Sequence, residues 1–439
     1  MRLYSTKNKK AFTQLKEAVL KGLPDDNGLY MPVEIPRLPE AFLNELSGFS
    51  FQEIAFTVCR SLFEHAIPDN DLKDIVYNAV NFPAPLARLD AEKYVLELFH
   101  GPSLAFKDFG ARFMAQLMSY FNQGEERELV ILVATSGDTG GAVAAGFLQA
   151  PGARVVILYP SGKVSMLQEK QLTTLGHNIT ALEVDGTFDD CQSMVKQAFL
   201  DSELTRKIRL TSANSINISR LIPQTFYYFE AFKQLPDDGR EVVFCVPSGN
   251  FGNLTAGLMA QRMGLPIHHF IAATNVNDVV PEYLESALFN PRPSVPTLSN
   301  AMDVGNPSNF ARMLDLCEGK EEGSTWNNMR KSITGYAFND EQTRQAVAEV
   351  YRKFGYIIDP HGAVGYLALC RFQQQYSNTK GVILETAHPA KFLDEVESIL
   401  NEKIEVPERL AILAEREKRA IHLSNDFNGF KKWLMDNLA

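Results

Sequence analysis

Cysteine is scarce in this chain, with only five among 439 residues. The five are odd in number and widely spaced, and no two of them form a Cys-x-x-Cys pair. This usage argues against a disulfide framework and a structural zinc site, and it fits a reducing compartment. The HExxH motif is missing too, and the adjacent His268 and His269 would face opposite sides of a strand. We therefore expect no metal ion.

Long apolar runs are also missing. No stretch of eighteen apolar residues occurs, and the basic start MRLYSTKNKK is not followed by the apolar core of a signal peptide. We therefore expect a cytoplasmic location and no membrane partner. The net charge is −10, and no cluster of lysine and arginine with interleaved aromatic residues occurs, so no nucleic-acid partner is expected either.

The feature that dominates the rest of the chain is alternation. From about residue 94, short β-branched or apolar runs alternate with helical patterns, which predicts an α/β fold with mainly parallel sheets covered on both faces. The first ninety residues instead carry amphipathic stretches and little strand pattern. We therefore predict a mostly helical N-terminal domain over 1–90 and two α/β domains over 91–215 and 216–439. The stretch 290–310, rich in proline, serine and asparagine, predicts a long ordered loop.

One lysine is unusual, because Lys107 lies between Phe106 and Phe109 in the segment HGPSLAFKDFG (100–110). The spacing of the apolar residues that follow places it at or near a helix N-terminus. Aromatic surroundings and the positive end of the helix dipole both disfavour an ammonium ion, and a free amine is what a Schiff-base lysine needs. Asp108 acts in the opposite direction. The alternative is a lysine whose stem lies along a core helix and whose charge reaches solvent.

Two loops between a strand and a helix offer backbone N–H groups to an anion. In SGNFGN (248–253), two glycines let successive N–H groups turn toward one point, which suits a phosphate group. This loop matches neither GxxxxGK[ST] nor GxGxxG, and the alternative is an ordinary glycine-rich turn. In ATSGDTGG (134–141), three hydroxyl side chains join the N–H groups, which suits a carboxylate. No nucleophilic serine of the GxSxG type is expected there, because Ala134 stands at the first glycine position.

A further segment, TSANSINISR (211–220), places Arg220 near amide and hydroxyl side chains before a helix. Its guanidinium group is suited to clamp a second anion, in a bidentate manner if that anion is a phosphate. The alternative is a capping loop with a solvated arginine. His388 in TAHPAKF is equally open, because a histidine after a strand can pack, cap a helix or act in catalysis.

Taken in order, the segments HGPSLAFKDFG, TSGDTGG, NSINISR, PSGNFGN and ETAHPAKF resemble the threonine synthase family. The segments YSTK (4–7) and GLYMP (28–32) resemble the opening of its longer, bacterial and fungal branch. The likeness runs from Tyr4 to about Phe392, which is most of the chain. It implies pyridoxal 5'-phosphate as the cofactor and two doubly wound α/β domains of the fold type II, tryptophan-synthase β-like kind. The implied reaction converts O-phospho-L-homoserine and water into L-threonine and phosphate by γ-elimination and β-replacement.

The resemblance also implies the site residues. Lys107 would carry the cofactor as a Schiff base and act as the main acid and base. The other implied cofactor contacts are Asp138, Thr386 at the pyridine nitrogen, and the phosphate-binding residues Gly249, Asn250, Phe251, Gly252 and Asn253. The implied substrate contacts are Ser103, then Thr135, Ser136 and Thr139 for the carboxylate, and Asn214, Ser215 and Arg220 for the phosphate.

The resemblance also implies a difference at Asp138, because related fold type II enzymes usually have asparagine at this position, near the 3-oxygen of the cofactor. The longer threonine synthases share the aspartate. An ionised carboxylate there would repel the cofactor phenolate unless a proton is shared.

Two other functions stay open from the sequence. Another fold type II lyase, such as a threonine dehydratase or a cysteine synthase, needs no site for a substrate phosphate, so Arg220 distinguishes it. A phosphate-binding α/β protein without catalysis has no use for Lys107. The expected partner is the small-molecule substrate, and the expected state is a monomer or homodimer.

Overall fold

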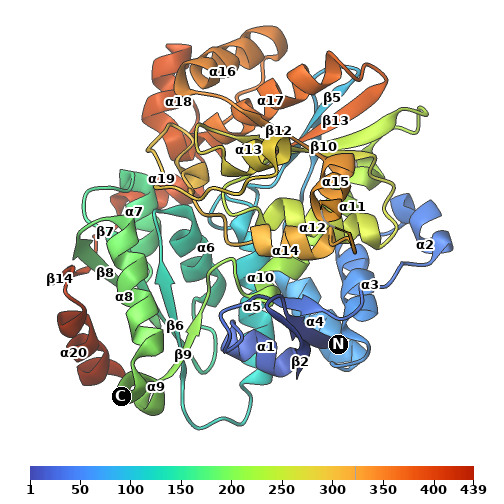
Figure 1. Cartoon of the computed structure of the whole chain (residues 1–439). Helices are drawn as coiled ribbons and strands as arrows, with labels where there is room; N and C mark the ends of the chain where they lie inside the picture. The colour runs from blue at the N-terminus through green and yellow to red at the C-terminus, as the bar shows by residue number, and fades with distance from the viewer. Residues whose placement is uncertain (322) are drawn as a thin grey trace.

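Two mainly parallel sheets form the framework of the computed structural model, which describes residues 1–321 and 323–439 (Figure 1). The larger sheet has the order β12 (Ile333–Ala337), β11 (His269–Thr274), β10 (Glu241–Pro247), β13 (Thr379–Glu385), β5 (Lys93–Glu97) and β4 (Leu86–Arg88). The smaller sheet has the order β14 (Ile421–Ser424), β8 (Ile179–Asp185), β7 (Ala153–Pro160), β6 (Leu129–Ala134) and β9 (Arg209–Ser212). Apart from the antiparallel pairing of β4 with β5, the strand pairs described in these two sheets are parallel. The predicted α/β fold is confirmed.

The inner strands are apolar on both faces, as a sheet covered by helices on both sides requires. Every residue of β6, β11 and β13 is buried. The covering and connecting helices are α5 (Lys107–Phe121), α6 (Asp138–Phe147), α7 (Met166–Thr173), α8 (Phe188–Leu200), α9 (Ser202–Lys207), α10 (Ile218–Leu221), α11 (Phe226–Gln234), α12 (Gly252–Arg262), α13 (Val279–Ser286), α14 (Phe310–Leu316), α15 (Ser324–Ser332), α16 (Asp340–Phe354), α17 (Pro360–Gln373), α18 (Leu393–Leu400), α19 (Glu408–Glu415) and α20 (Phe427–Leu438). Within the described parts of the chain, no helix is long and apolar enough to cross a membrane.

The strand pairing does not follow the order of the chain. β5 pairs with β13 in the larger sheet, and β14, close to the C-terminus, pairs with β8 in the smaller one. The division of the chain at residues 90 and 215 predicted from the sequence would separate β5 and β14 from the sheets that they complete. This difference arises because parallel neighbours are joined by long crossovers, so the order of strands in a sheet is not written in the local pattern.

The N-terminal part contains the expected helices together with a small antiparallel sheet. Helices α3 (Phe51–Phe63) and α4 (Asp69–Ala79) are formed by amphipathic stretches, and the shorter α2 (Glu40–Asn44) precedes them. The sheet has the order β2 (Asn8–Gln14), β1 (Arg2–Ser5) and β3 (Tyr30–Pro32). Helix α1 (Leu15–Lys21) follows β2 directly. Strand β2 leaves little trace in the sequence because its side chains are almost all exposed, so they show no apolar alternation.

Aromatic packing fixes helix α5 between the N-terminal helices and α11. The ring centroid of Phe109 lies 5.6 Å from that of Tyr227, and that of Phe113 lies 5.7 Å from that of Phe226. Edge-to-face contacts of this kind add to the free energy of apolar burial, each by about 0.5–1.5 kcal/mol. The first residue of α5, Lys107, is therefore presented by a well-anchored helix.

Four loops that follow strands carry most of the predicted site residues. β5 leads to α5, β6 to α6, β10 to α12, and β13 to the short 3-10 helix η4 (Pro389–Phe392). Ligands of open parallel sheets bind beyond the carboxyl ends of the strands. The connectivity alone thus brings these loops to the edge of the sheets where a ligand is expected.

Candidate active site

Lys107 follows a strained loop that is held by the segment after β13. Leu104 has a φ of 59°, in the left-handed region that residues other than glycine rarely adopt. The Phe106 N–H donates to the Thr386 carbonyl at 2.9 Å, and the His388 N–H donates to the Leu104 carbonyl at 3.0 Å. Two segments that the sequence assigned to one site are therefore adjacent.

Lys107 is partly accessible as a residue, but its amine is enclosed by protein atoms. Burial lowers the pKa of Lys107 to about 8, while Asp138 raises it and both Lys391 and Arg220 lower it. A pKa near 8 leaves far more unprotonated amine at neutral pH than the ordinary lysine pKa does. Lys107 thus has a substantial nucleophilic fraction near neutral pH, which favours a chemical role over that of a solvated surface lysine.

Asp138, the first residue of α6, is paired with a lysine from η4. Its Oδ1 accepts from Lys391 Nζ at 2.7 Å and from Gln168 Nε2 at 2.9 Å. Burial alone would raise the pKa of this carboxyl, but Lys391 and Lys107, together with these hydrogen bonds, hold the pKa of Asp138 well below its usual range. The negative charge that the sequence left unbalanced is therefore compensated by an ammonium group rather than by a shared proton.

The loop after β10 turns through a second strained residue. Phe251, the residue before α12, has a φ of 59° and a ψ of 19° and is buried. Asn253 shapes the loop from within, because its Nδ2 donates to the Pro247 carbonyl at 2.8 Å and its Oδ1 accepts from Ser248 Oγ at 3.2 Å. A phenylalanine held in the left-handed region indicates a functional constraint. Phe251 directly precedes the N-terminus of α12, where free backbone N–H groups can bind an anion.

Two glycines of this loop have different surroundings. A Cβ atom at Gly249 would lie 2.7 Å from the Ala301 carbonyl oxygen and 3.0 Å from Met302 Cα, so backbone excludes any side chain there. A Cβ atom at Gly252 would meet no atom closer than 3.5 Å, the distance to Asn309 Nδ2. A methyl group at Gly252 would therefore fit in ordinary van der Waals contact with the side chains of Asn309 and Gln224.

The hydroxyl groups of the loop after β6 differ in their accessibility. Thr135 is buried, and its Oγ1 accepts from the N–H groups of Gly137 and Gly140, both at 2.9 Å. Thr135 therefore shapes the start of α6. Ser136 and Thr139 are partly accessible, so they are better placed than Thr135 to reach a bound carboxylate.

Arg220 is a buried arginine with an unused donor. Its side chain donates from Nη1 to the Ala213 carbonyl at 2.7 Å, and among the described residues its Nε has no hydrogen-bond partner. Burial lowers the pKa of Arg220 to about 10, and Asp108 raises it, so the group remains a cation at neutral pH. A Cβ atom at Gly110 would lie 2.8 Å from Arg220 Nε, so the glycine makes room for the guanidinium group one turn of α5 beyond Lys107. The alternative of a solvated arginine is wrong.

Ser308 connects the loop of SGNFGN with the loop before Arg220. Its Oγ donates to Asn250 Oδ1 at 3.1 Å and lies 3.5 Å from Ser215 Oγ. Asn214 is partly accessible, but its Oδ1 is buried and has no hydrogen-bond partner among the described residues. The two predicted phosphate sites are therefore neighbours in the structure.

Lys391 and two glutamines contact the predicted site residues, and sequence reasoning missed them. Lys391 Nζ donates to the Ser103 carbonyl at 2.8 Å in addition to Asp138, and Gln171 Nε2 donates to the same carbonyl at 3.0 Å. Gln168 completes the set through Asp138. A lysine inside the apolar run HPAKF was the available indication, because an unpaired charge would not be buried there.

Arg312 was also missed, and the sequence offers no indication of it. Its side chain is fully buried, and its nitrogens donate to the carbonyl oxygens of Tyr30 at 3.1 Å and Ile216 at 2.7 Å, and to Asn309 Oδ1 at 2.7 Å. Every residue has a backbone carbonyl, so the sequence does not reveal which residues accept these hydrogen bonds. Arg312 ties the N-terminal part to the loop that precedes Arg220.

His388 caps η4. Its Nδ1 accepts from the Ala390 N–H at 3.1 Å. Burial lowers the pKa of His388 to about 4, with Arg409 and His100 acting in the same direction, so the ring is neutral at pH 7. Of the three alternatives left open by the sequence, the structure supports capping and packing, since the His388 ring centroid also lies 5.0 Å from that of Phe99.

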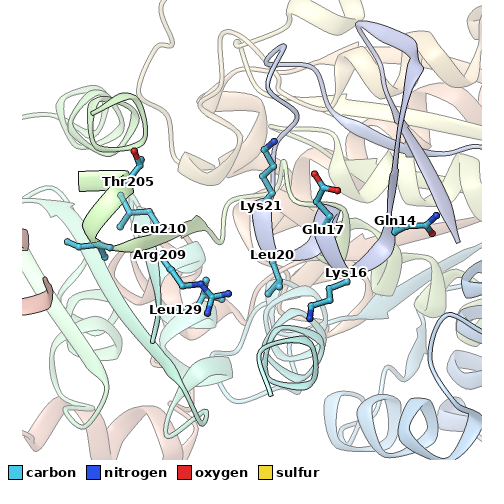
Figure 2. A pocket seen from close by; sticks show the side chains of 10 residues that line it. Gln14, Lys16, Glu17, Leu20, Lys21, Leu129, Thr205, Arg209 and Leu210 are labelled. Atoms are coloured by element: carbon cyan, nitrogen blue, oxygen red, sulfur yellow. The ribbon is translucent and has the colours of Figure 1, made fainter. Parts of the chain in front are cut away.

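A separate hollow is lined by none of these residues (Figure 2). Its volume is about 510 Å³, and α1 faces β6, β9 and the end of α9 across it. The lining residues are Gln14, Lys16, Glu17, Leu20, Lys21, Leu129, Thr205, Ile208, Arg209 and Leu210. Because no predicted site residue is among them, the hollow is not part of the candidate active site.

The residues around Lys107 fit pyridoxal phosphate. The cofactor needs an amine for its covalent attachment, N–H groups for its phosphate and a polar group near its pyridine nitrogen. Lys107 offers the amine, and the first turn of α12, which begins at Gly252, offers the N–H groups. The Thr386 carbonyl accepts a hydrogen bond from the N–H of Phe106, the residue before Lys107, so Thr386 lies close to this part of the site.

Comparison with protein families covers almost the whole chain. Residues 2–80 match the family described as threonine synthase N terminus, residues 80–386 match pyridoxal-phosphate dependent enzyme, and residues 362–433 match threonine synthase, C-terminal.

Individual relatives match over their full length. Threonine synthase from Escherichia coli K12 is 44% identical over 438 residues, which is 100% of both chains. The crystal structure of threonine synthase from Escherichia coli has a TM-score of 0.91 at 44% identity and covers 99% of this chain and 100% of its own. The structure of pyridoxal-phosphate-bound threonine synthase from Brucella melitensis has a TM-score of 0.93 at 35% identity and covers 100% of this chain and 99% of its own. The similarity therefore includes the N- and C-terminal parts as well as the two sheets.

Proposed function

The chain belongs to the threonine synthase family, and we propose that it acts on O-phospho-L-homoserine with Lys107 as its catalytic lysine. It is a pyridoxal-phosphate-dependent lyase of threonine biosynthesis, with pyridoxal phosphate as its cofactor. The choice of a phosphorylated substrate is supported above all by Arg220, whose buried guanidinium group has an unused donor beside helix α5. Buried cationic donors of this kind bind anions strongly.

Lys107 would hold the cofactor and move the protons of the reaction. Bound pyridoxal phosphate supplies the electron sink for charge that develops on the substrate. After the substrate amine takes its place, Lys107 would remove the proton at Cα and then one at Cβ, and would return a proton at Cγ once phosphate has left. A pKa near 8 suits both acceptance and release of protons close to neutral pH. Water would then add at Cβ to provide the hydroxyl group of threonine, and a proton would return to Cα before the product leaves.

Two anion sites would orient the substrate. The partly accessible Ser136 and Thr139, with the N–H groups at the start of α6, would bind the carboxylate. Arg220, with Asn214 and Ser215, would bind the phosphate and hold Cγ in the site until the leaving group departs. Ser103, whose Oγ is buried without a partner among the described residues, would donate to the substrate between them.

The two alternative functions leave parts of this arrangement unexplained. A threonine dehydratase or cysteine synthase needs no site for a substrate phosphate, so the unused donor of Arg220 would have no role. A phosphate-binding protein without catalysis would not need an amine with the lowered pKa of Lys107.

The proposal is tested by product analysis. The purified protein with bound pyridoxal phosphate is incubated with O-phospho-L-homoserine, and inorganic phosphate and L-threonine are quantified. We expect equal amounts of both. Phosphate accompanied by L-homoserine or mainly by 2-oxobutyrate would contradict the proposed reaction, and a protein that keeps its visible absorption band but releases no phosphate would contradict the proposed substrate.

Alanine at the two glycines of the cofactor loop is expected to have different effects. Gly249→Ala places a Cβ atom against the backbone of residues 301 and 302, so we expect it to destabilise the fold by about 1–3 kcal/mol. Gly252→Ala meets no such obstacle and should leave the stability of the cofactor-free protein within about 1 kcal/mol. Its methyl group nevertheless enters the space proposed for the cofactor phosphate, so affinity for pyridoxal phosphate should fall by roughly tenfold or more.

Both effects can be measured together. Thermal unfolding of each variant without cofactor reports stability, and titration with pyridoxal phosphate reports affinity. Unchanged affinity in Gly252→Ala would place the cofactor phosphate elsewhere.

A further inference from the structure

Lys391 is a buried lysine that links two loops beside Lys107. Its side chain is 1% exposed and lies on η4. It donates to Asp138 Oδ1 at 2.7 Å, at the start of α6, and to the Ser103 carbonyl at 2.8 Å, on the loop after β5. Packing alone does not require a lysine here, because an apolar side chain would fill the same space without the cost of burying a charge.

The pair is only part of a larger charge arrangement around Lys107. Helix α6 contributes Asp138, η4 contributes Lys391, and α10 contributes Arg220. On α5 itself, Asp108 turns toward the preceding loop, where its Oδ2 accepts from the Ser103 N–H at 2.8 Å. Asp138 is the one carboxylate among these groups that acts on the pKa of Lys107, and it acts in the opposite direction to Lys391.

Two ammonium groups, those of Lys391 and Lys107, act on the Asp138 carboxylate. Its Oδ1 is directly bonded to Lys391 and to the uncharged Gln168. Lys107 influences the same carboxyl but makes no direct bond to it among the contacts described. The carboxylate is therefore bound to the lysine that carries no proposed chemistry.

We propose that Lys391 is a positioning residue that keeps Asp138 as a carboxylate bound away from Lys107, so that Lys107 faces a nearly neutral pair instead of a free negative charge. The proposal rests on the proposed function only in that pyridoxal phosphate is bound at Lys107. It explains why a carboxylate is tolerated beside the expected cofactor phenolate. It also explains why a lysine occupies a fully buried place in HPAKF.

The test compares four cofactor-loaded proteins: wild type, Lys391→Met, Asp138→Asn and the double variant. The readout is the pH midpoint, between pH 5 and 11, at which the visible absorbance of the bound cofactor changes without substrate. Lys391→Met leaves Asp138 uncompensated and should shift this midpoint upward by about one pH unit or more. Asp138→Asn leaves Lys391 uncompensated and should shift it downward. The double variant restores a neutral pair and should return close to the wild-type value.

Lys380 provides a matched control. Its side chain is 3% exposed, and it also binds one carboxylate, Asp238 Oδ1 at 2.7 Å, and one carbonyl oxygen, that of Pro236. It lies at the start of β13, at the other end of this strand from Thr386. Lys380→Met should lower thermal stability and leave the midpoint unchanged.

The outcomes separate a charge effect from a structural one. Shifts of opposite sign in the two single variants, cancelled in the double variant, support the proposal. Shifts of the same sign, a double variant that stays as far from the wild-type midpoint as either single variant, or no transition in any protein would overturn it. If Lys391→Met does not fold, Asp138→Asn decides alone, since a downward shift supports the proposal and any other result contradicts it. Because no substrate is used, failure of the proposed substrate would not affect this result.

Discussion

Replacing Lys107 with alanine is expected to reduce threonine formation by at least about four orders of magnitude, because the variant loses the amine that would hold the cofactor and move the protons. The fold should survive. Lys107 is the first residue of α5, and the aromatic packing of Phe109 and Phe113 that anchors this helix is untouched. Removing a buried ammonium group also removes its desolvation cost.

The measurement for Lys107→Ala combines activity with two physical readouts. Release of phosphate from O-phospho-L-homoserine reports activity, the visible absorbance after addition of pyridoxal phosphate reports covalent attachment, and thermal unfolding reports stability. Lys93→Ala is a suitable control, since Lys93 begins β5 and its partly buried side chain pairs with Asp90, which is not among the proposed site residues. A Lys107→Ala protein that retains a tenth of the wild-type rate would contradict the assigned role.

Replacing Arg220 with methionine is expected to lower kcat/KM for the phosphorylated substrate by roughly 30-fold to several thousand-fold. This range corresponds to the 2–5 kcal/mol that truncation of a buried, hydrogen-bonded charge pair costs. Methionine has a similar length and can occupy the space beside Gly110. Stability should change little, because the variant loses one bond to the Ala213 carbonyl and one buried charge together.

Inorganic phosphate distinguishes the role of Arg220 from a general disturbance of the site. In the wild-type protein, phosphate should compete with the substrate, and its inhibition constant should rise in Arg220→Met by a factor similar to the loss in kcat/KM. The affinity for pyridoxal phosphate should stay within about threefold of wild type. Loss of activity with unchanged inhibition by phosphate would show that Arg220 does not bind the leaving group.

The fold and the main site loops follow from local patterns in the sequence. Alternating apolar strands and helices predict the parallel sheets, and loops that follow such strands are the place for a ligand. The unusual setting of Lys107 between two phenylalanines was visible for the same reason, because burial of a charge next to aromatic residues is a local property.

Other features depend on partners that are distant in the sequence. The ionised state of Asp138 could not be predicted, because its compensating charge, Lys391, comes from another loop and another sheet. The same holds for Arg312, whose partners are backbone carbonyls of Tyr30 and Ile216. The pairing of β14 with β8 in the smaller sheet could not be predicted from local sequence either, since the edge strand of either sheet could pair with an additional strand.

The most direct test of the account is the fate of solvent oxygen. The protein with bound pyridoxal phosphate is incubated with O-phospho-L-homoserine in ¹⁸O-labelled water, and the products are analysed by mass spectrometry. Cleavage of the Cγ–O bond followed by addition of water at Cβ predicts unlabelled phosphate and one ¹⁸O atom in the hydroxyl group of L-threonine. Labelled phosphate together with unlabelled L-homoserine would show cleavage of the P–O bond and would contradict the proposed reaction.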